Sequence, residues 1–319
     1  MPDTRWGLTL PFPGVTLRDH RALVQRAEAA GYDDLWTGET NGPDGFTPLV
    51  LAAAWTDRLR LGTGVVNPFT RGPGVLAQHA AALQDASGGR FCLGIGSSSN
   101  VIVERWNGVP FEKPLTRVRE AVEALRPVLA GGRGPGGFKL ETPPQTPPPI
   151  YVAALRDKML ALGGEVGDGT FVNFLPLSAL PRVATQIRAG EAAAGKPEGA
   201  SDVVCRFFCV PQAPDEGLGL ARFLFAAYGT VPVYEAFFRS LGWGDALDPM
   251  VTAWRAGDRP LALERSPDEL IREIFIFGSP DEMKARLAEF EAGGITTFVL
   301  TPLCGPEQLP GFIDGLARA

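Results

Sequence analysis

Histidine and cysteine are scarce in this sequence, and their scarcity argues against several kinds of enzyme chemistry. The 319 residues include two histidines, His20 and His79, and four cysteines, at positions 92, 205, 209 and 304. No Cys-x-x-Cys pair is present, and neither histidine has the Cys or Glu neighbours typical of a zinc site. Two isolated histidines also offer no Ser-His-Asp triad. We therefore expect no metal, and we expect reduced, buried thiols.

Basic tracts and long apolar runs are also missing. The formal net charge is −6, which argues against a nucleic-acid partner. No apolar run approaches the ~18 residues of a membrane span. The first residues, MPDTRWGLTL, lack the basic and apolar regions of a signal peptide. We expect a cytoplasmic protein that acts on a small molecule and has neither nucleic acid nor membrane as a partner.

The sequence does contain a regular alternation of strand-like and helix-like segments. We expect strands at 6–10, 34–38, 59–66, 91–96, 150–155, 169–175, 203–210 and 296–302, with helices between them. This alternation implies parallel strands joined by crossovers, and eight such units make a (β/α)8 TIM barrel, an α/β fold. A doubly wound sheet would carry G-x-G-x-x-G after its first strand, but that strand ends LTLPFPG.

The length is compatible with one large domain, so we expect residues 1–319 to form a single TIM-barrel domain. Residues 211–278 are too long for one crossover. They contain helix-like segments such as LARFLFAAYG, VYEAFFRSLGW and PDELIREIFIFG, and they predict a helical insertion between strands seven and eight. Such an insertion would shield the mouth of the barrel or make a dimer contact.

In a barrel, functional residues gather at the carboxyl ends of the strands. Here these ends are rich in Gly, Ser, Ala, Asn and aromatic residues and poor in acids and bases, which suits a flat cofactor that supplies the chemistry itself. The third strand ends GTGVVNP, which indicates either a tight turn or a backbone deformed against a ligand. The second interpretation places a bulge or a non-proline cis peptide at Gly64–Val65, with Asn67 ending the strand.

Two further strand ends have the composition of an anion site. In GIGSSSN, residues 94–100, the glycines would let amides approach an oxyanion and the serines would add donors, although a plain serine-rich turn is an equal alternative. In AALRDKM, residues 153–159, a helix that starts near Asp157 would direct free amides at a phosphate. Arg156 and Lys158 would add positive charge, and the alternative is a surface salt-bridge cluster, which is favoured for Lys158.

Glu39 is the one acid at a predicted strand end, and it is our candidate catalytic residue. It would orient a substrate or relay a proton. A capping or salt-bridge role is an equally good interpretation of the same residue.

The order of these motifs resembles the bacterial luciferase-like monooxygenase superfamily. The resemblance is carried by "NPFTR…P" within residues 58–99, by SGGRF and LGIG in the same stretch, and by YVAAL, and it spans nearly the whole chain. The sequence is most similar to the deazaflavin (coenzyme F420)-dependent branch, which includes methylenetetrahydromethanopterin reductase. The motifs are specific for the superfamily but not for cofactor or substrate.

The resemblance implies a (β/α)8 barrel with the redox ring in its mouth, against a bulge after strand three that often contains a cis peptide. It places the cofactor phosphate by the loops after strands four and five. The implied cofactor-binding residues are Gly64, Val65, Asn67, Gly96, Ser97, Ser98, Ala153, Ala154, Leu155, Arg156 and Lys158. Many relatives have Gly-Pro where this chain has Arg156-Asp157, and an Asp there would compete with phosphate for the amides. The sugar-phosphate dehydrogenase branch has His and Glu where this chain has Thr40 and Ser99.

The resemblance therefore implies an oxidoreductase that passes a hydride between coenzyme F420 and an organic substrate that the sequence does not identify. An FMN-dependent monooxygenase that uses dioxygen is the first alternative. A non-catalytic flavin-binding protein is the second. Family dimers lead us to expect a homodimer.

Overall fold

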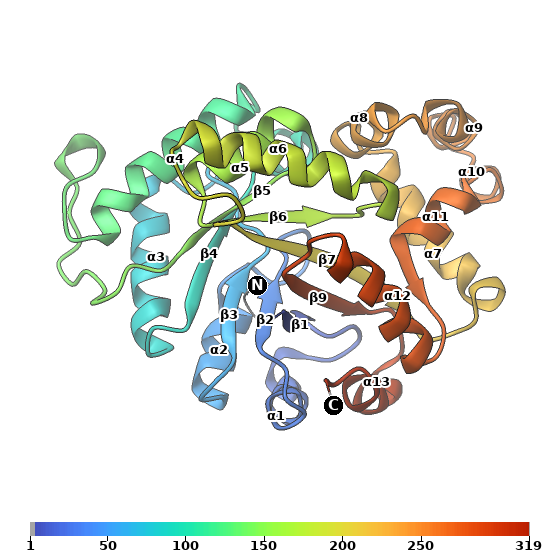
Figure 1. The fold of residues 1–319 in the computed structure, drawn as a ribbon, viewed down its shortest axis with the longest axis horizontal. Helices are drawn as coiled ribbons and strands as arrows, with labels where there is room; N and C mark the ends of the chain where they lie inside the picture. Colours follow the sequence, from blue (N-terminus) through green and yellow to red (C-terminus); the bar gives the residue numbers. More distant parts are fainter. Residues whose placement is uncertain (1–3, 319) are drawn as a thin grey trace.

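Eight parallel strands close into a barrel in the computed structural model, which describes residues 4–318 (Figure 1). They are β1 (Arg5–Leu10), β2 (Asp34–Thr37), β3 (Arg60–Thr63), β4 (Phe91–Ile95), β5 (Ile150–Ala153), β6 (Gly169–Asn173), β7 (Asp202–Val210) and β9 (Thr297–Pro302). Each of the first six strands pairs with the next, β7 pairs with β6 and β9, and β9 pairs with β1. The predicted TIM barrel is confirmed.

Helices cover the outside of the barrel and connect its strands. They are α1 (His20–Ala29), α2 (Thr47–Trp55), α3 (Pro73–Ala86), α4 (Pro114–Leu129), α5 (Asp157–Val166), α6 (Leu180–Ala193), α12 (Pro280–Ala292) and α13 (Leu309–Gly315). Several begin with proline at the first or second position, where the missing N–H has no intrahelical partner to lose. A capping box of Ser279 and Glu282 also fixes the start of α12.

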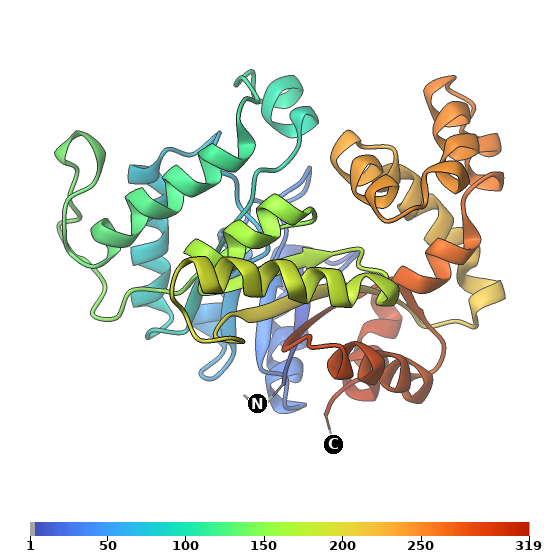
Figure 2. The same cartoon turned by 45° about the horizontal axis from the view of Figure 1, so that its top comes forward.

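The chain between β7 and β9 forms α7 (Pro214–Gly229), α8 (Pro232–Ser240), α9 (Gly244–Arg255), α10 (Arg259–Glu264), α11 (Asp268–Ile274) and a short strand, β8 (Phe275–Phe277). Figure 2 shows α7–α10 gathered on one side of the barrel. β8 pairs with the last residues of β7, outside the ring of eight strands. We expected Phe275–Phe277 to continue a helix, and this was wrong. Aromatic and β-branched residues favour a strand, and the open edge of β7 offers one a partner.

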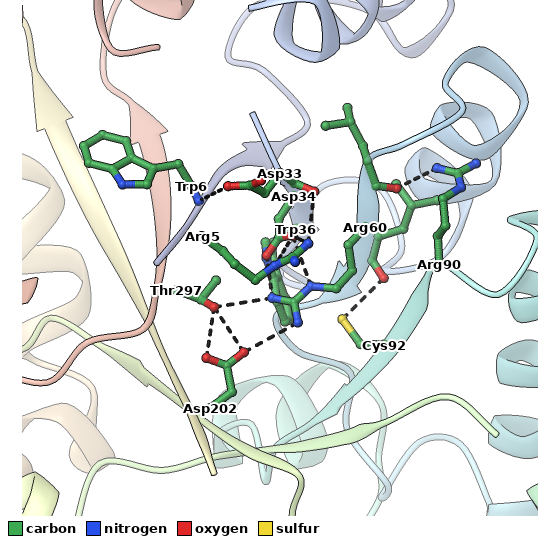
Figure 3. A network of polar contacts seen from close by, with 12 residues as sticks. Arg5, Trp6, Asp33, Asp34, Trp36, Arg60, Arg90, Cys92, Asp202 and Thr297 are labelled. Carbon is green, nitrogen blue, oxygen red and sulfur yellow. Dashed lines mark hydrogen bonds and ion pairs between the residues drawn. The ribbon is translucent and has the colours of Figure 1, made fainter. Parts of the chain in front are cut away.

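Charged and polar side chains close the amino end of the barrel, where the strands begin (Figure 3). Asp34 is fully buried and accepts from Arg5 at 2.6 Å and from Arg60 at 2.5 Å. The Asp202 carboxylate lies 3.5 Å from Arg60 and accepts a hydrogen bond from Thr297 at 3.0 Å. These groups come from β1, β2, β3, β7 and β9, so this network ties most of the barrel together at the end that serves stability in such folds.

An apolar layer lies inside the barrel, one side-chain level nearer the carboxyl ends of the strands. It consists of Trp36, Cys92, Tyr151, Phe171, Val204 and Val299, with Val65 and Ala153 packed against it. The inside of the barrel is therefore filled up to this layer. Within the barrel, a ligand would therefore bind on the side of this layer that faces the carboxyl ends of the strands. Within residues 4–318, no helix has the length and apolarity that crossing a bilayer requires.

Candidate functional site

Three adjacent strands place a glycine at the carboxyl end of the barrel: Gly38 after β2, Gly64 after β3 and Gly96 after β4. A Cβ on Gly64 would lie 2.8 Å from the Phe171 ring. A Cβ on Gly96 would lie 2.6 Å from Val65 and 2.8 Å from the Ala153 Cβ. The three positions therefore face the interior, and the missing side chains leave this half of the mouth without bulk above the apolar layer.

The opposite half of the mouth has polar side chains. Thr9 of β1 and Thr301 of β9 share a hydrogen bond of 2.7 Å between their hydroxyls. Arg206 of β7 donates through Nε to Asn173 of β6 at 3.2 Å. The mouth thus combines a smooth, glycine-lined side with a side that offers hydroxyls, an amide and a guanidinium.

The backbone between Gly64 and Val66 leaves the regular ladder. The Gly64–Val65 peptide is cis, as one interpretation of the sequence predicted. Gly64 donates to Thr37 O at 2.5 Å, and pairing with β4 resumes at Val66, whose N–H donates to Gly94 O at 3.0 Å. The half-buried Val65 side chain lies over Gly96 beside Ala153. Val65 therefore presents an apolar surface where the resemblance places the face of the ring.

Free donors gather in the loop after β4. The amides of Ser97, Ser98 and Ser99 form no hydrogen bond within residues 4–318, and all three residues are partly exposed. Ser98 has φ 61°, a left-handed conformation that non-glycine residues adopt infrequently outside special sites. A π-helix, η2 (Val101–Trp106), follows. The geometry is compatible with the predicted anion-binding role of Gly96, Ser97 and Ser98.

The loop after β5 lies beside the loop after β4, because β4 and β5 pair along their length. Ala154 is buried and its N–H donates to Phe171 O at 2.9 Å, whereas Ala153 and Leu155 are half-buried and Arg156 and Lys158 are exposed. α5 begins at Asp157, so its first amides are unpaired by helix geometry. Neither Arg156 nor Lys158 pairs with a carboxylate in the described part of the chain.

The Asp157 carboxylate is shared between Arg182 and the amide of its own residue. Its carboxylate accepts two hydrogen bonds from Arg182 of α6, at 2.8 and 2.9 Å. The hydrogen bonds from Arg182 hold the pKa of the Asp157 carboxyl below its usual value, so the carboxylate stays charged and turned toward α6. An anion at this helix start would compete with the Asp157 carboxylate for the first amide of α5.

Two predicted site residues have other partners. Asn67 is buried, and its Oδ1 accepts from the Phe69 and Thr70 amides at 3.1 and 3.0 Å, so its side chain forms a turn and has no oxygen free for a ligand. Both oxygens of Glu39 accept from Arg71, each at 2.6 Å. This ion pair joins the loops after β2 and β3 and favours the salt-bridge interpretation of Glu39 over the catalytic one.

Sequence reasoning missed Arg206 and its neighbour Tyr234. Arg206 is the single charged residue in VVCRFFCV, a run that otherwise reads as a buried strand. A lone arginine in such a run was the available signal, because charged residues inside buried strands are rare without a specific role. Tyr234 of α8 accepts a hydrogen bond from Asn173 Nδ2 at 3.0 Å. No sequence pattern places α8 at the mouth of the barrel.

The residues at the mouth fit a flat redox ring with an anionic tail. Glycines clear space above Trp36 and Phe171, Val65 offers an apolar face, and the loops after β4 and β5 offer free amides and two cations. This donor set suits a cofactor that brings its own redox chemistry.

Comparison with known proteins agrees with this site. The model of the luciferase-like monooxygenase family matches residues 5–297. A 5,10-methylenetetrahydromethanopterin reductase of Archaeoglobus fulgidus is 33% identical, over 89% of this chain and 90% of its own. A Mycobacterium tuberculosis protein provisionally named a coenzyme F420-dependent oxidoreductase is 32% identical, over 93% of this chain and 92% of its own.

A solved structure gives the same architecture. The coenzyme F420 dependent tetrahydromethanopterin reductase from Methanopyrus kandleri superimposes with a TM-score of 0.82 at 24% identity, over 99% of this chain and 98% of that one. The relatives are oxidoreductases, and the cofactor class that they indicate is a deazaflavin or flavin. The chain therefore belongs to the luciferase-like monooxygenase family, as an oxidoreductase enzyme.

Proposed function

We propose that the protein transfers a hydride between coenzyme F420, a deazaflavin, and a small organic substrate. The observation that carries the proposal is the identity of 32–33% over about nine-tenths of the chain to two proteins, one named for coenzyme F420 and the other a methylenetetrahydromethanopterin reductase. The glycine-lined mouth supports it, because it offers a seat for a ring and because Arg71 binds both oxygens of Glu39, the acid at a strand end that would otherwise suit general-base chemistry.

The roles of the residues follow from their places. Gly64 and Val65 would support one face of the ring, leaving the other face to the substrate. The amides of Ser97 and Ser98, with Arg156 and Lys158, would hold the phosphate of the cofactor. When bound, the deazaflavin supplies the hydride-carrying carbon. The protein orients both reactants and, through the filled barrel interior below the site, excludes water from that side.

Titration of the purified apoprotein with coenzyme F420 and with FMN, followed by fluorescence, tests the cofactor. We expect a Kd for coenzyme F420 in the micromolar range or tighter, and at least ten-fold weaker binding of FMN. Tight binding of FMN alone would overturn the proposal in favour of the monooxygenase alternative. Tight binding of coenzyme F420 without hydride exchange to any tested acceptor would instead favour a binding protein.

A further inference from the structure

Arg206 is a cation without a counter-charge at the mouth of the barrel. It is partly buried, and within residues 4–318 no carboxylate lies within ion-pair distance of it. At the opposite end of the barrel, by contrast, Arg5 and Arg60 both pair with Asp34. A partly buried charge is costly to leave unpaired, so an unpaired arginine in this position points to a ligand.

Neighbouring side chains hold the guanidinium in one orientation. Its Nε donates to Asn173 Oδ1 at 3.2 Å, and Asn173 Nδ2 donates to the Tyr234 hydroxyl at 3.0 Å. Because an arginine can only donate, the first bond fixes the amide with its oxygen toward Arg206. The guanidinium also stacks over the Phe208 ring, with 5.0 Å to the ring centroid. The terminal nitrogens Nη1 and Nη2 have no hydrogen-bond partner in the described chain, so a pre-oriented fork of donors remains open.

This fork lies beside the proposed ring seat. Arg206 Nη1 is 3.1 Å from the point that a Cβ on Gly38 would occupy, and the Gly64 carbonyl oxygen is 3.7 Å from the same point. β7 and β2 are not neighbours in the barrel, since β9 and β1 separate them. The side chain of Arg206 therefore reaches across the mouth, from the polar half to the glycine-lined half.

We propose that Arg206 binds an oxyanion at the centre of the barrel mouth, next to the ring. A planar guanidinium with two free nitrogens matches a carboxylate or another pair of oxygens that share negative charge. Two sources have this chemistry: a carboxylate on the substrate, or the negatively charged pyrimidine edge of the reduced deazaflavin. The inference rests on the proposed function for the second source, whereas the first requires only Arg206 and the side chains around it.

The test compares Arg206→Gln with the wild type and with a matched control, Arg117→Gln. Arg117 is also partly buried, donates to the Pro68 carbonyl at 3.2 Å and stacks on the Phe69 ring, but it contacts the loop after β3 from α4, outside the ring of strands. Each protein is titrated with oxidised coenzyme F420, with reduced coenzyme F420, and with benzoate as a carboxylate probe. Benzoate binding is measured by calorimetry on the apoprotein and on the protein loaded with oxidised coenzyme.

If the ring is the source, Arg206→Gln weakens binding of the reduced coenzyme at least ten-fold and leaves the oxidised coenzyme within three-fold. If the substrate is the source, both coenzyme affinities stay within three-fold and benzoate binding is lost. Arg117→Gln should match the wild type in every titration. Equal behaviour of the two variants overturns the inference. If the wild type binds neither coenzyme F420 nor FMN, the proposed function fails, and the benzoate titration of the apoprotein still decides the role of Arg206.

A second variant guards against loss of folding in Arg206→Gln. Asn173→Asp places a carboxylate at the position that now accepts from Arg206, so the arginine is kept but its charge is neutralised. We expect this variant to lose oxyanion binding as Arg206→Gln does, at a melting temperature close to that of the wild type. Retention of oxyanion binding in Asn173→Asp would contradict the proposal.

Discussion

At the scale of single residues, the site depends on small groups in fixed places. Val65 is held by its packing on Gly96 and Ala153, and this packing is possible because position 96 has no side chain. Glu39, which the sequence offers as the natural catalytic acid, has both oxygens bound by Arg71. Arg206, in contrast, carries a partly buried charge that pairs with no carboxylate of residues 4–318.

Val65→Asp should abolish cofactor binding, by at least 100-fold in Kd, and leave the barrel folded. A carboxylate at this half-buried position would oppose an aromatic ring and add negative charge near the anionic tail. The measurement is titration with coenzyme F420, with circular dichroism to confirm folding. The matched control is Val75→Asp, because Val75 lies on α3 and is 45% exposed. Unchanged affinity in Val65→Asp would count against the ring seat.

Glu39→Gln should lower stability and leave the chemistry in place. The substitution removes the charge that Arg71 faces, and losing a charged hydrogen-bond partner in a largely buried pair costs about 1–3 kcal/mol. Thermal unfolding and turnover per folded molecule are the measurements. Lost turnover at an unchanged melting temperature would restore Glu39 as a proton relay.

At the scale of elements, the connection from β1 to α1 is held by a buried histidine. His20 Nε2 accepts from the Phe12 N–H at 2.8 Å, and Nδ1 lies 2.7 Å from Thr16 O, so the neutral ring with its proton on Nδ1 satisfies both bonds. The ring also stacks on Phe12. Burial lowers the pKa of His20 from its usual value of 6.5.

This connection predicts a pH dependence of stability. A histidine whose pKa is lower in the folded state takes up its proton first in the unfolded state. The stability that His20 contributes is therefore complete above about pH 6.5 and declines as the pH falls toward the folded pKa, by at most about 1.4 kcal/mol per pH unit. Denaturant unfolding of wild type and His20→Gln at pH 7.5 and 5.5 measures the effect. A slope that is the same in both proteins would contradict this account.

Element by element, the sequence predicts the barrel better than its edges. Alternation of strand and helix patterns depends on hydrophobic periodicity, which eight strands buried on both faces display strongly. The sequence did not predict β8, because Phe275–Phe277 follows α11 without a turn residue. Three apolar residues are also too few to show a strand or helix periodicity. The predicted third strand extended to residue 66, but the ladder stops at Thr63 because the chain departs from it at Gly64–Val65.

The sequence predicts the part of the candidate site that depends on glycines near strand ends. It does not predict the part that depends on side chains far apart in the sequence. GTGVVNP and GIGSSSN show their glycines in the sequence, so the shape of the glycine-lined half could be expected. The contacts among Arg206, Asn173 and Tyr234 exist because the fold brings β7, β6 and α8 together. A single sequence does not show which of its elements lie side by side. The Asn67 side chain forms a turn in the structure, and an asparagine that forms a turn looks the same in a sequence as one that binds a ligand.

At the scale of the whole molecule, the barrel separates stability from function along its axis. The amino end has the buried Asp34 with two arginines, the middle is apolar, and the carboxyl end has the glycines and the free guanidinium. Asp34 and the arginines at the amino end pair with each other inside the protein. The Arg206 guanidinium at the carboxyl end has no carboxylate partner among residues 4–318, and we propose a ligand as its partner. The homodimer and the single-domain organisation remain predictions.

Asp34→Asn should destabilise the whole barrel by about 3–5 kcal/mol, because it leaves Arg5 and Arg60 beside an uncharged partner at a buried position. The affinity of the remaining folded molecules for coenzyme F420 should not change, since the network lies at the far end. Asp314→Asn is the control: its pair with Arg26 is solvent-exposed, and such pairs contribute little to stability. Chemical denaturation and coenzyme titration are the two measurements. Equal stability losses in both variants would argue against the closing role of this network.

The lack of a side chain at Gly38 affects the space available in the mouth of the barrel. The hydrogen atom of this glycine stands between the Arg206 guanidinium and the Gly64 carbonyl, so the clearance at the axis of the barrel is set by a residue with no side chain. A methyl group added at this position would exclude larger substrates from the mouth of the barrel. It would not remove any of the side chains that we propose to bind the substrate. The range of molecules accepted by this enzyme is thus open to tuning in steps of a single carbon.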